Sequence, residues 1–296
     1  MRYMSNPRGS LPPPSAQWAR TAPAVERRKA LGQNFFRSPT DACRFVRQVQ
    51  EDSTATVVEI GAGSGMITSA LSAAGRSVEA VEIDPEWAKR LAERELVGVR
   101  VHTADFLDWQ MPLGALLFVG NIPFGSSTSI VRHCLQVGPT RLRGMVLLTQ
   151  REFAEKRCGR WGGNLFNAQW APWFSFSLGE QFSRRKFKPA PATDTATLFV
   201  DPLSGPMLPW ADRVIYQETV RALFSTGHAQ VREACAAVSR TNSWPGRAGV
   251  SEHTRVKDLS TSDWVALHLS KSIQHIGESR RGVRVRRQSP ARRKKH

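Results

Sequence analysis

The chain has 296 residues, 41% of them hydrophobic, and a formal net charge of +17. This length and composition allow one sizeable core and a second, smaller one, which excludes a wholly disordered chain. No apolar run approaches the roughly 18 to 20 residues that span a bilayer, and the start of the chain does not resemble a secretory signal. We therefore expect a cytoplasmic protein that does not act in a membrane.

Cysteine spacing argues against a metal centre and against a disulfide framework. The four cysteines, Cys43, Cys134, Cys158 and Cys235, lie far apart, and no two of them form a Cys-x-x-Cys pair. Zinc sites and small disulfide-bonded domains need closely spaced ligands or partners. We expect reduced thiols and no bound metal.

The positive charge is concentrated in certain segments. Residues 279–296 contain nine arginines and lysines and no acid, residues 1–30 are also basic, and residues 111–200 are basic where residues 31–110 are acidic. Basic segments beside a near-neutral body suggest a polyanionic partner, because lysine and arginine at phosphates release condensed counterions. For the two tails alone, solvated disorder without a partner stays open as an alternative.

The first two thirds of the chain alternate between strand and helix patterns. Strands are predicted at Thr56–Ile60, Ser77–Ile83, Val99–Thr103, Ala115–Val119 and Gly144–Thr149, and helices at Pro39–Gln50, Met66–Ala74, Pro85–Glu95 and Ser129–Gln136. Trp170–Phe176 and Thr195–Val200 are predicted to add an antiparallel pair. Strand, glycine turn, helix and strand in repetition are typical of a doubly wound parallel sheet.

Beyond about Pro202 the pattern becomes helical, at Tyr216–Phe224, Gln230–Ser239 and Ser262–Leu269. The predicted fold is therefore α/β, a Rossmann-like doubly wound sheet with a small α-helical C-terminal domain. We expect a disordered basic segment at 1–30, a catalytic domain at 31–201, a helical domain at 202–272 and a disordered Arg/Lys-rich tail at 273–296.

A glycine loop follows the first predicted parallel strand, in the sequence Glu59-Ile-Gly-Ala-Gly-Ser-Gly65. Glycines lack a Cβ atom, so the backbone at Gly61 and Gly63 can approach a ligand closely. Taken alone the loop also fits an ordinary tight turn, and its G-x-G-x-G spacing differs from the G-x-G-x-x-G of nicotinamide enzymes.

Acidic residues at the next two strand ends favour a nucleoside ligand. Glu82 ends the second strand and can accept hydrogen bonds from both hydroxyls of a ribose. Asp105 follows the third strand, where a carboxylate can hold an adenine amino group between the side chains of Ile83 and Phe106.

The segment Gly120-Asn-Ile-Pro-Phe124 directly follows the fourth strand and indicates the reaction. An exocyclic amine is a poor nucleophile, because its lone pair is delocalised into the ring. The side-chain oxygen of Asn121 and the main-chain oxygen of Ile122 can accept both amine hydrogens and free that lone pair. Pro123 would fix the turn, and Phe124 would stack on the base.

Together these motifs resemble the rRNA adenine N6-methyltransferase family, which includes the Erm 23S rRNA methyltransferases and the KsgA-type 16S rRNA dimethyltransferases. The resemblance rests on motif order and spacing over about residues 29 to 270. It also includes Leu31-Gly-Gln-Asn-Phe-Phe36 near the start and Gln150-Arg-Glu-Phe153 after the fifth strand. Arg184–Pro191 and the Arg-rich tail favour the Erm branch.

The resemblance implies S-adenosyl-L-methionine as cofactor and ribosomal RNA as partner, with a 23S adenine as the target and macrolide-lincosamide-streptogramin B resistance as the outcome. It implies a protein that works as a monomer and without metal. The implied cofactor contacts are Asn34, Phe36, Gly61, Gly63, Glu82, Ile83, Asp105, Phe106 and Asn121, and the implied catalytic loop is Asn121, Ile122, Pro123 and Phe124.

Two alternatives stay open at this point. The chain can be a KsgA-type 16S rRNA adenine dimethyltransferase, or an RNA-binding assembly factor that keeps the cofactor pocket without turnover. A DNA adenine methylase is disfavoured, since Ile122 stands where such enzymes carry a second proline.

Overall fold

A computed structural model gives the fold of residues 33–50, 52, 54–160, 163–239 and 244–270. The basic segment 1–30 and the tail 273–296 lie outside these described residues. By their internal contacts the described residues form two units. The first contains residues up to 160 together with 173–210, and the second contains residues 163–172 and those from 211 onward.

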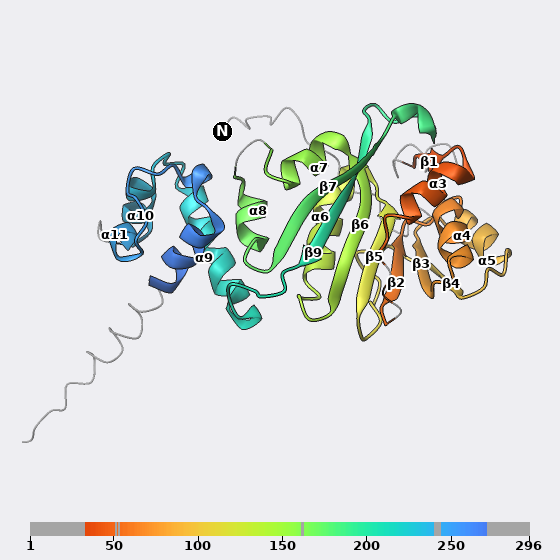
Figure 1. The fold of residues 1–296 in the computed structure, drawn as a ribbon, viewed down its shortest axis with the longest axis horizontal. Helices are drawn as coiled ribbons and strands as arrows, with labels where there is room; N and C mark the ends of the chain where they lie inside the picture. Colours follow the sequence, from red (N-terminus) through yellow and green to blue (C-terminus); the bar gives the residue numbers. More distant parts are fainter. Residues whose placement is uncertain (1–32, 51, 53, 161–162, 240–243, 271–296) are drawn as a thin grey trace, which may run out of the picture. The chain divides into compact units, whose positions relative to one another are not determined.

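The first unit is built on a seven-stranded sheet with the order β4-β3-β2-β5-β6-β9-β7 (Figure 1). The strands are β2 (Thr56–Ile60), β3 (Val78–Glu82), β4 (Val99–Thr103), β5 (Leu116–Asn121), β6 (Leu142–Gln150), β7 (Phe174–Phe182) and β9 (Thr195–Pro202). The first five strands are parallel, β9 pairs antiparallel with β6, and β7 pairs antiparallel with β9. From β2 the chain adds β3 and β4 on one side and then returns to add β5 on the other side. Doubly wound folds place their ligands at such a switch point, here between β2 and β5.

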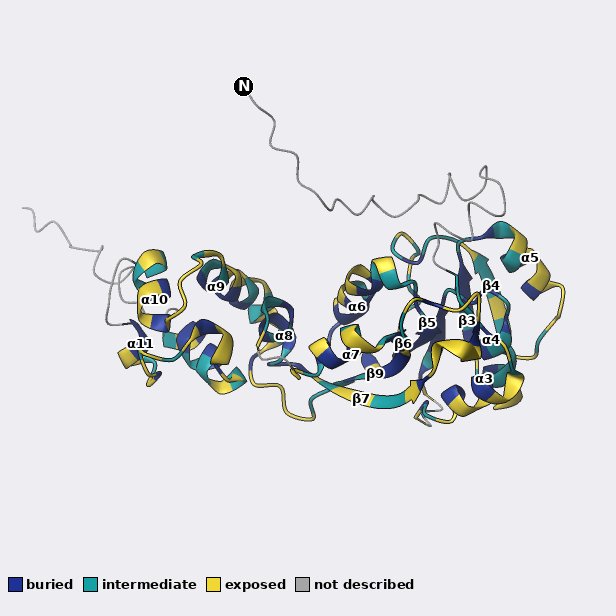
Figure 2. Cartoon of the chain, turned by 90° about the horizontal axis from the view of Figure 1, so that it is seen from above, coloured by how far each residue is buried: buried dark blue, intermediate teal, exposed yellow. Residues whose placement is uncertain are grey.

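Helices cover both faces of this sheet. They are α3 (Pro39–Val46), α4 (Met66–Ala73), α5 (Pro85–Ala92), α6 (Ser127–Leu135) and α7 (Arg151–Arg157), with short 3-10 turns at Phe124–Ser126 and Arg184–Lys186. In Figure 2, α3 lies on the opposite side of the sheet from α6. Side-chain caps begin two of them, since Ser38 accepts from the Thr40 amide and Asp84 from the Glu86 amide.

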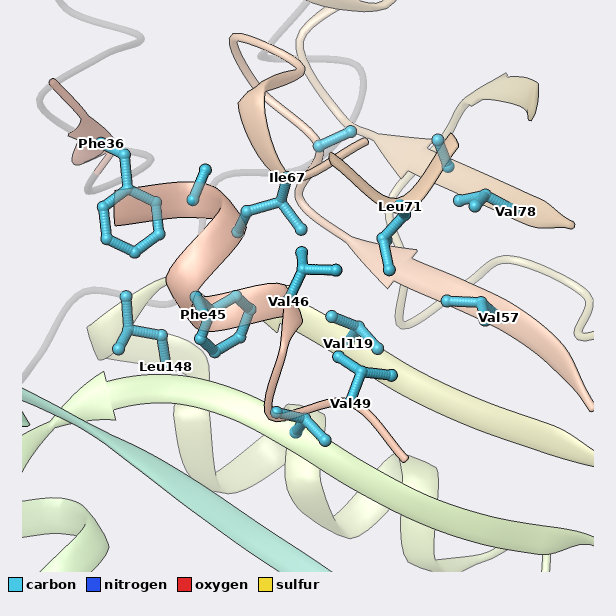
Figure 3. Packing of buried hydrophobic residues seen from close by; sticks show 14 of the residues in the cluster. Phe36, Phe45, Val46, Val49, Val57, Ile67, Leu71, Val78, Val119 and Leu148 are labelled. Carbon is cyan, nitrogen blue, oxygen red and sulfur yellow. The ribbon is translucent and has the colours of Figure 1, made fainter. Parts of the chain in front are cut away.

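A hydrophobic cluster joins α3 and α4 to the sheet (Figure 3). Alternate residues of the central strands point into it, including Val57, Val119 and Leu148. The two-residue strand β1 (Phe35–Phe36) pairs antiparallel with β8 (Phe187–Lys188) at the rim of this cluster. The Phe36 ring lies 4.8 Å from that of Phe187, so β1 is anchored by its second residue.

The prediction of a doubly wound α/β sheet is confirmed, but two elements were wrong in detail. Trp170 does not begin a strand, because it ends a helix, α8 (Leu165–Trp170), which is capped by Asn164, and β7 begins only at Phe174. The first helix ends at Val46 and not at Gln50. The amides of Gln48 and Val49 donate to carbonyls three residues earlier, as in a 3-10 turn, and not four residues earlier as in an α-helix.

The second unit is helical. It contains α8, α9 (Arg213–Ser225), α10 (Val231–Ser239), α11 (Trp244–Arg247), a 3-10 turn at Val256–Asp258 and a helix over residues 261–270, and a further turn, Trp210–Asp212, precedes α9. Buried polar groups tie these pieces together, since the Tyr216 hydroxyl donates to the Ala168 carbonyl at 2.7 Å and Trp244 Nε1 to the Leu267 carbonyl at 2.9 Å. None of the helices in the described part of the chain is long and apolar enough to span a membrane.

Gly120 permits the close approach of β5 to β2, and its replacement should destabilise the first unit. A Cβ atom built there would lie 2.5 Å from the Ile60 main-chain oxygen, so Gly120→Ala forces the two strands apart. We expect a loss of about 1 to 3 kcal/mol in the free energy of unfolding, measured by denaturant titration. Gly205→Ala is the control, because its Cβ would meet open space, and equal stability of the two variants would contradict this account.

Candidate functional site

A pocket opens at the carboxyl ends of β2, β3 and β5. It has about 590 Å³ of space, part of it open to solvent, and it is lined by Gln33, Asn34, Phe35, Phe36, Gly61, Ala62, Ser64, Met66, Ile67, Glu82, Ile83, Asn121 and Pro123. The pocket thus brings together residues 33–36, called the N-terminal segment from here on, with the glycine loop, the acidic end of β3 and the loop after β5.

The glycine loop forms the floor of this pocket and adopts the backbone that only glycine takes easily. Gly63 has φ of +51°, and a Cβ atom there would lie 2.3 Å from the Phe35 ring. The Gly63 amide donates to Glu82 Oε2 at 2.7 Å. A missing side chain therefore both admits Phe35 and lets the loop backbone reach the carboxylate.

Glu82 is a buried carboxylate held by main-chain donors. The Asp84 amide donates to its Oε1 at 2.8 Å and the Gly63 amide to its Oε2, while only 3% of the residue is exposed. Burial raises the pKa of Glu82 to about 7, against the two amides, which favour the ionised form. Each oxygen can accept one further hydrogen bond from a ligand in the pocket.

Asn121 ends β5 and faces the same pocket with a fixed amide. Its Nδ2 donates to the main-chain oxygen of Asn34, far away in the sequence. Because a carbonyl can only accept, the amide must turn its nitrogen toward Asn34, and its Oδ1 is left to face elsewhere. The hydrogen bond to Asn34 thus uses the donor end of the amide, and Oδ1 is the end that can accept a hydrogen bond.

The loop after Asn121 is closed by its own hydrogen bonds. The Pro123 carbonyl accepts from the Ser126 amide at 3.1 Å and from the Ser127 hydroxyl at 3.1 Å. The Ile122 side chain is buried and its amide bonds to the Leu148 carbonyl, while Phe124 is half-buried in the 3-10 turn that follows. The turn leads directly into α6.

Several of the sequence-predicted residues do not line the pocket. Gly63, Asp105, Phe106, Ile122 and Phe124 are absent from its wall. The Asp105 carboxylate accepts from the Leu107 amide at 2.9 Å, and the Phe106 ring packs edge-on against Phe118. Their proposed ligand contacts stay predictions.

Sequence reasoning missed other lining residues. Gln33 and Phe35 flank the predicted Asn34, and Ala62 and Ser64 lie inside the glycine motif, whereas Met66 and Ile67 begin α4. The first four belong to motifs that had already been singled out, so adjacency was the signal. The alternation of side chains along a strand could not show that Phe35 faces the pocket, because a strand of two residues is too short to reveal a period.

Glu59 is a second buried acid, on β2 below the glycine loop and 1% exposed. Burial raises the pKa of Glu59 to about 8. Hydrogen bonding by Thr68, near the start of α4, lowers this pKa, and the negative charge of Glu82 raises it further. Near neutral pH the folded protein therefore holds a proton on Glu59.

Among the described residues, no group of three or more histidine, cysteine, aspartate or glutamate side chains is arranged to hold a metal ion.

A mostly parallel sheet of this order, with a glycine loop after β2 and a buried acid at the end of β3, defines a class I methyltransferase fold. A family model described as ribosomal RNA adenine dimethylase matches residues 24–273. The chain belongs to this family, which confirms the predicted resemblance and the predicted enzyme class.

Individual relatives agree with this placement. The chain is 40% identical over 200 residues to an rRNA methyltransferase of Streptomyces thermotolerans, a match that covers 66% of each protein. It is 33% identical to the mycinamicin-resistance protein MyrB of Micromonospora griseorubida, over 83% of this chain and 79% of that one. The solved structure of the 23S rRNA methyltransferase ErmE superposes with a TM-score of 0.67 at 29% identity, covering 80% of this chain and 98% of ErmE.

The raised pKa of Glu59 predicts a pH-dependent stability. A group whose folded pKa lies above its ordinary value stabilises the fold at low pH and loses that contribution as pH rises through the folded value. Between about pH 5 and pH 8 the unfolded chain is ionised at Glu59 while the folded chain is not. In the unaltered protein the free energy of unfolding should therefore fall as pH rises over this range. In Glu59→Gln, whose side chain stays neutral, this fall should be smaller.

Denaturant titrations at several pH values measure the effect. Glu152→Gln is the control, because Glu152 is exposed on α7. Curves for Glu59→Gln and the unaltered protein that run parallel from pH 5 to pH 9 would show that Glu59 does not keep its proton on folding.

Proposed function

We propose that this protein transfers a methyl group from S-adenosyl-L-methionine to N6 of an adenine in 23S rRNA, and that the modification gives resistance to macrolide, lincosamide and streptogramin B antibiotics. The observation that carries the proposal is that Glu82 and Asn121 line one pocket. An acceptor suited to ribose hydroxyls thus lies in the same cavity as an acceptor suited to an amine.

The residues present fit the cofactor. Glu82 has acceptor capacity left on both carboxylate oxygens, which two ribose hydroxyls can fill, and Gly61 offers a backbone without side chain at the pocket floor. Ile83 lines the pocket beside Glu82 and offers an apolar face to a purine. S-adenosyl-L-methionine would supply an electrophilic methyl group on a sulfonium. Asn34, Phe36 and Gly63 complete the proposed cofactor contacts from the N-terminal segment and the loop, and Asp105 and Phe106 from the end of β4.

The chain's own residues would act mainly by positioning. Asn121 Oδ1 and the Ile122 carbonyl would accept the two hydrogens of the adenine amine, so that its lone pair becomes available for in-line attack on the methyl carbon. Phe124 would stack on the base, with Pro123 fixing the loop. The proton leaves easily once the nitrogen is cationic, so a strong general base is not needed.

An adenine reaches such a pocket only when it leaves its stack, so unpaired or flipped RNA is the expected substrate. We infer that the helical region 202–272 is an RNA-binding domain and that residues 31–201 form the catalytic domain. We also infer that the protein acts as a cytoplasmic monomer without metal. Exposed arginines and lysines at residues 184–186 and 188 add positive charge to the catalytic domain. They suit contacts with phosphates.

Methyl transfer to different RNAs tests the proposal. Tritium from labelled S-adenosyl-L-methionine should enter naked 23S rRNA, or assembling large subunits, and not 16S rRNA. Expression in a sensitive bacterium should raise macrolide tolerance, and Glu82→Ala, which should bind the cofactor weakly, should raise it less. Transfer to 16S rRNA would favour the KsgA-type alternative, and cofactor binding without transfer to any RNA would favour an assembly factor.

Glu82→Ala should weaken cofactor binding by about 1.5 to 3 kcal/mol, the range for hydrogen bonds to a charged group. Affinity of the unaltered protein should also fall as pH drops through about 7, because a protonated Glu82 accepts fewer hydrogen bonds. Isothermal calorimetry measures both. Glu79→Gln is the control, since Glu79 lies on the same strand but pairs with Arg100. Cofactor affinity that is the same for Glu82→Ala as for the unaltered protein would sink the assignment.

Asn121 and Phe124 should differ in the step they affect. Asn121→Ala should slow single-turnover methylation more than it weakens RNA binding, because the acceptor matters most as charge develops on nitrogen. Phe124→Ala should lose most activity and Phe124→Tyr keep much of it, since stacking is worth about 1 to 3 kcal/mol per base. If Phe124→Ala reacts at the normal rate with both substrates saturating, stacking by this residue is not part of the mechanism.

A further inference from the structure

An aromatic pair connects the N-terminal segment to the first turn of α5. The ring of Phe35 meets that of Trp87 edge-on, with centroids 5.1 Å apart and an interplanar angle of 63°. Phe35 lines the pocket and covers the open face of Gly63, whose amide is bonded to Glu82. Trp87 thus touches the residue that lies directly over the glycine loop.

Two residues on one face of α5 support the glycine loop, one through Phe35 at Gly63 and one directly at Gly65. Trp87 and Leu91 are four positions apart, so they share a helix face. A Cβ atom at Gly65 would lie 2.5 Å from Leu91 Cδ1, and one at Gly63 would lie 2.3 Å from the Phe35 ring that Trp87 supports. The helix therefore packs on the loop directly through Leu91 and indirectly through Trp87.

The remainder of the N-terminal segment is held by fixed contacts. Phe36 is 3% exposed in the core beside Phe187, and the Arg37 amide donates to the Lys186 carbonyl at 2.8 Å. The Asn34 carbonyl accepts from Asn121. Between these two anchors, the Phe35 ring packs against Trp87 of α5, so the indole helps to fix its position.

We propose that Phe35 and Trp87 form a clasp that holds the N-terminal segment across the ribose end of the pocket and slows release of the cofactor. The clasp rests on the proposed function, since it concerns the same cofactor. Trp87 acts through Phe35 and is a positioning residue. The Arg90 guanidinium, which pairs with Glu86, also contacts the indole, at 5.3 Å from its centroid.

Cofactor binding by Trp87 variants tests the clasp. An edge-on aromatic pair is worth about 0.5 to 1.5 kcal/mol, so Trp87→Ala should raise the dissociation constant for S-adenosyl-L-methionine about two- to tenfold, mostly through faster dissociation. The Michaelis constant for the cofactor should rise equally while kcat at saturation is kept. Trp87→Phe should restore affinity, because it retains a ring against Phe35.

Controls separate this role from a general loss of stability. Trp109→Ala removes an indole that packs on His102, 5.0 Å away on β4, and should leave cofactor binding unchanged. Wild-type dissociation constant and rate in Trp87→Ala overturn the clasp, and so does a Trp87→Phe variant that binds no better than Trp87→Ala. If the unaltered protein binds no cofactor, both the proposed function and the clasp fail. If the unaltered protein binds the cofactor and Trp87→Ala does not change that binding, only the clasp is rejected.

Discussion

The pocket depends on one buried carboxylate. Glu82 accepts from the Gly63 amide on one oxygen and from the Asp84 amide on the other, so it joins the loop after β2 to the start of α5. Charged groups in a low-dielectric interior need such partners. The same two bonds fix where the loop backbone lies, and hence where a ligand's ribose and the ring of Phe35 can fit. Removing the carboxylate would therefore loosen the floor of the pocket as well as remove a ligand contact.

A second buried acid below the loop, Glu59, affects the protonation state of the pair that it forms with Glu82. Glu59 and Glu82 are both buried, and the charge of Glu82 raises the pKa of Glu59. Two neighbouring ionised carboxylates in such surroundings repel each other, so the pair favours one charge and one proton. Glu82 has two amide donors and takes the charge more readily, which leaves the proton on Glu59. The arrangement supplies an ionised acceptor at the pocket and a neutral acid in the core.

Sequence patterns predicted the parallel sheet because its buried strands, glycine turn and strand-end acids are each short and local. They predicted the place of Glu82 and Asn121, since the carboxyl ends of the parallel strands β3 and β5, on either side of β2, meet at one edge of the sheet. They could not predict the orientation of the Asn121 amide, which is set by the Asn34 carbonyl, nor the position of the Phe35 ring, which depends on the pairing of β1 with β8 and on the Trp87 ring. Both depend on main-chain contacts between distant segments, and main-chain groups have no signature in a sequence.

The N-terminal segment therefore connects the two halves of the proposed chemistry. Through Phe35 it lies against the glycine loop, and through the Asn34 carbonyl it fixes which end of the Asn121 amide can accept a hydrogen. A displacement of this segment would widen the space around the cofactor and free the amide to rotate by 180°, which would present a donor to the amine hydrogens instead of an acceptor. Two neighbouring residues of one segment thus have separate tasks, since Phe35 packs over the glycine loop and Asn34 orients the catalytic amide. Under the proposed function, a protein of this design would hold its amine acceptor ready only while the segment is seated.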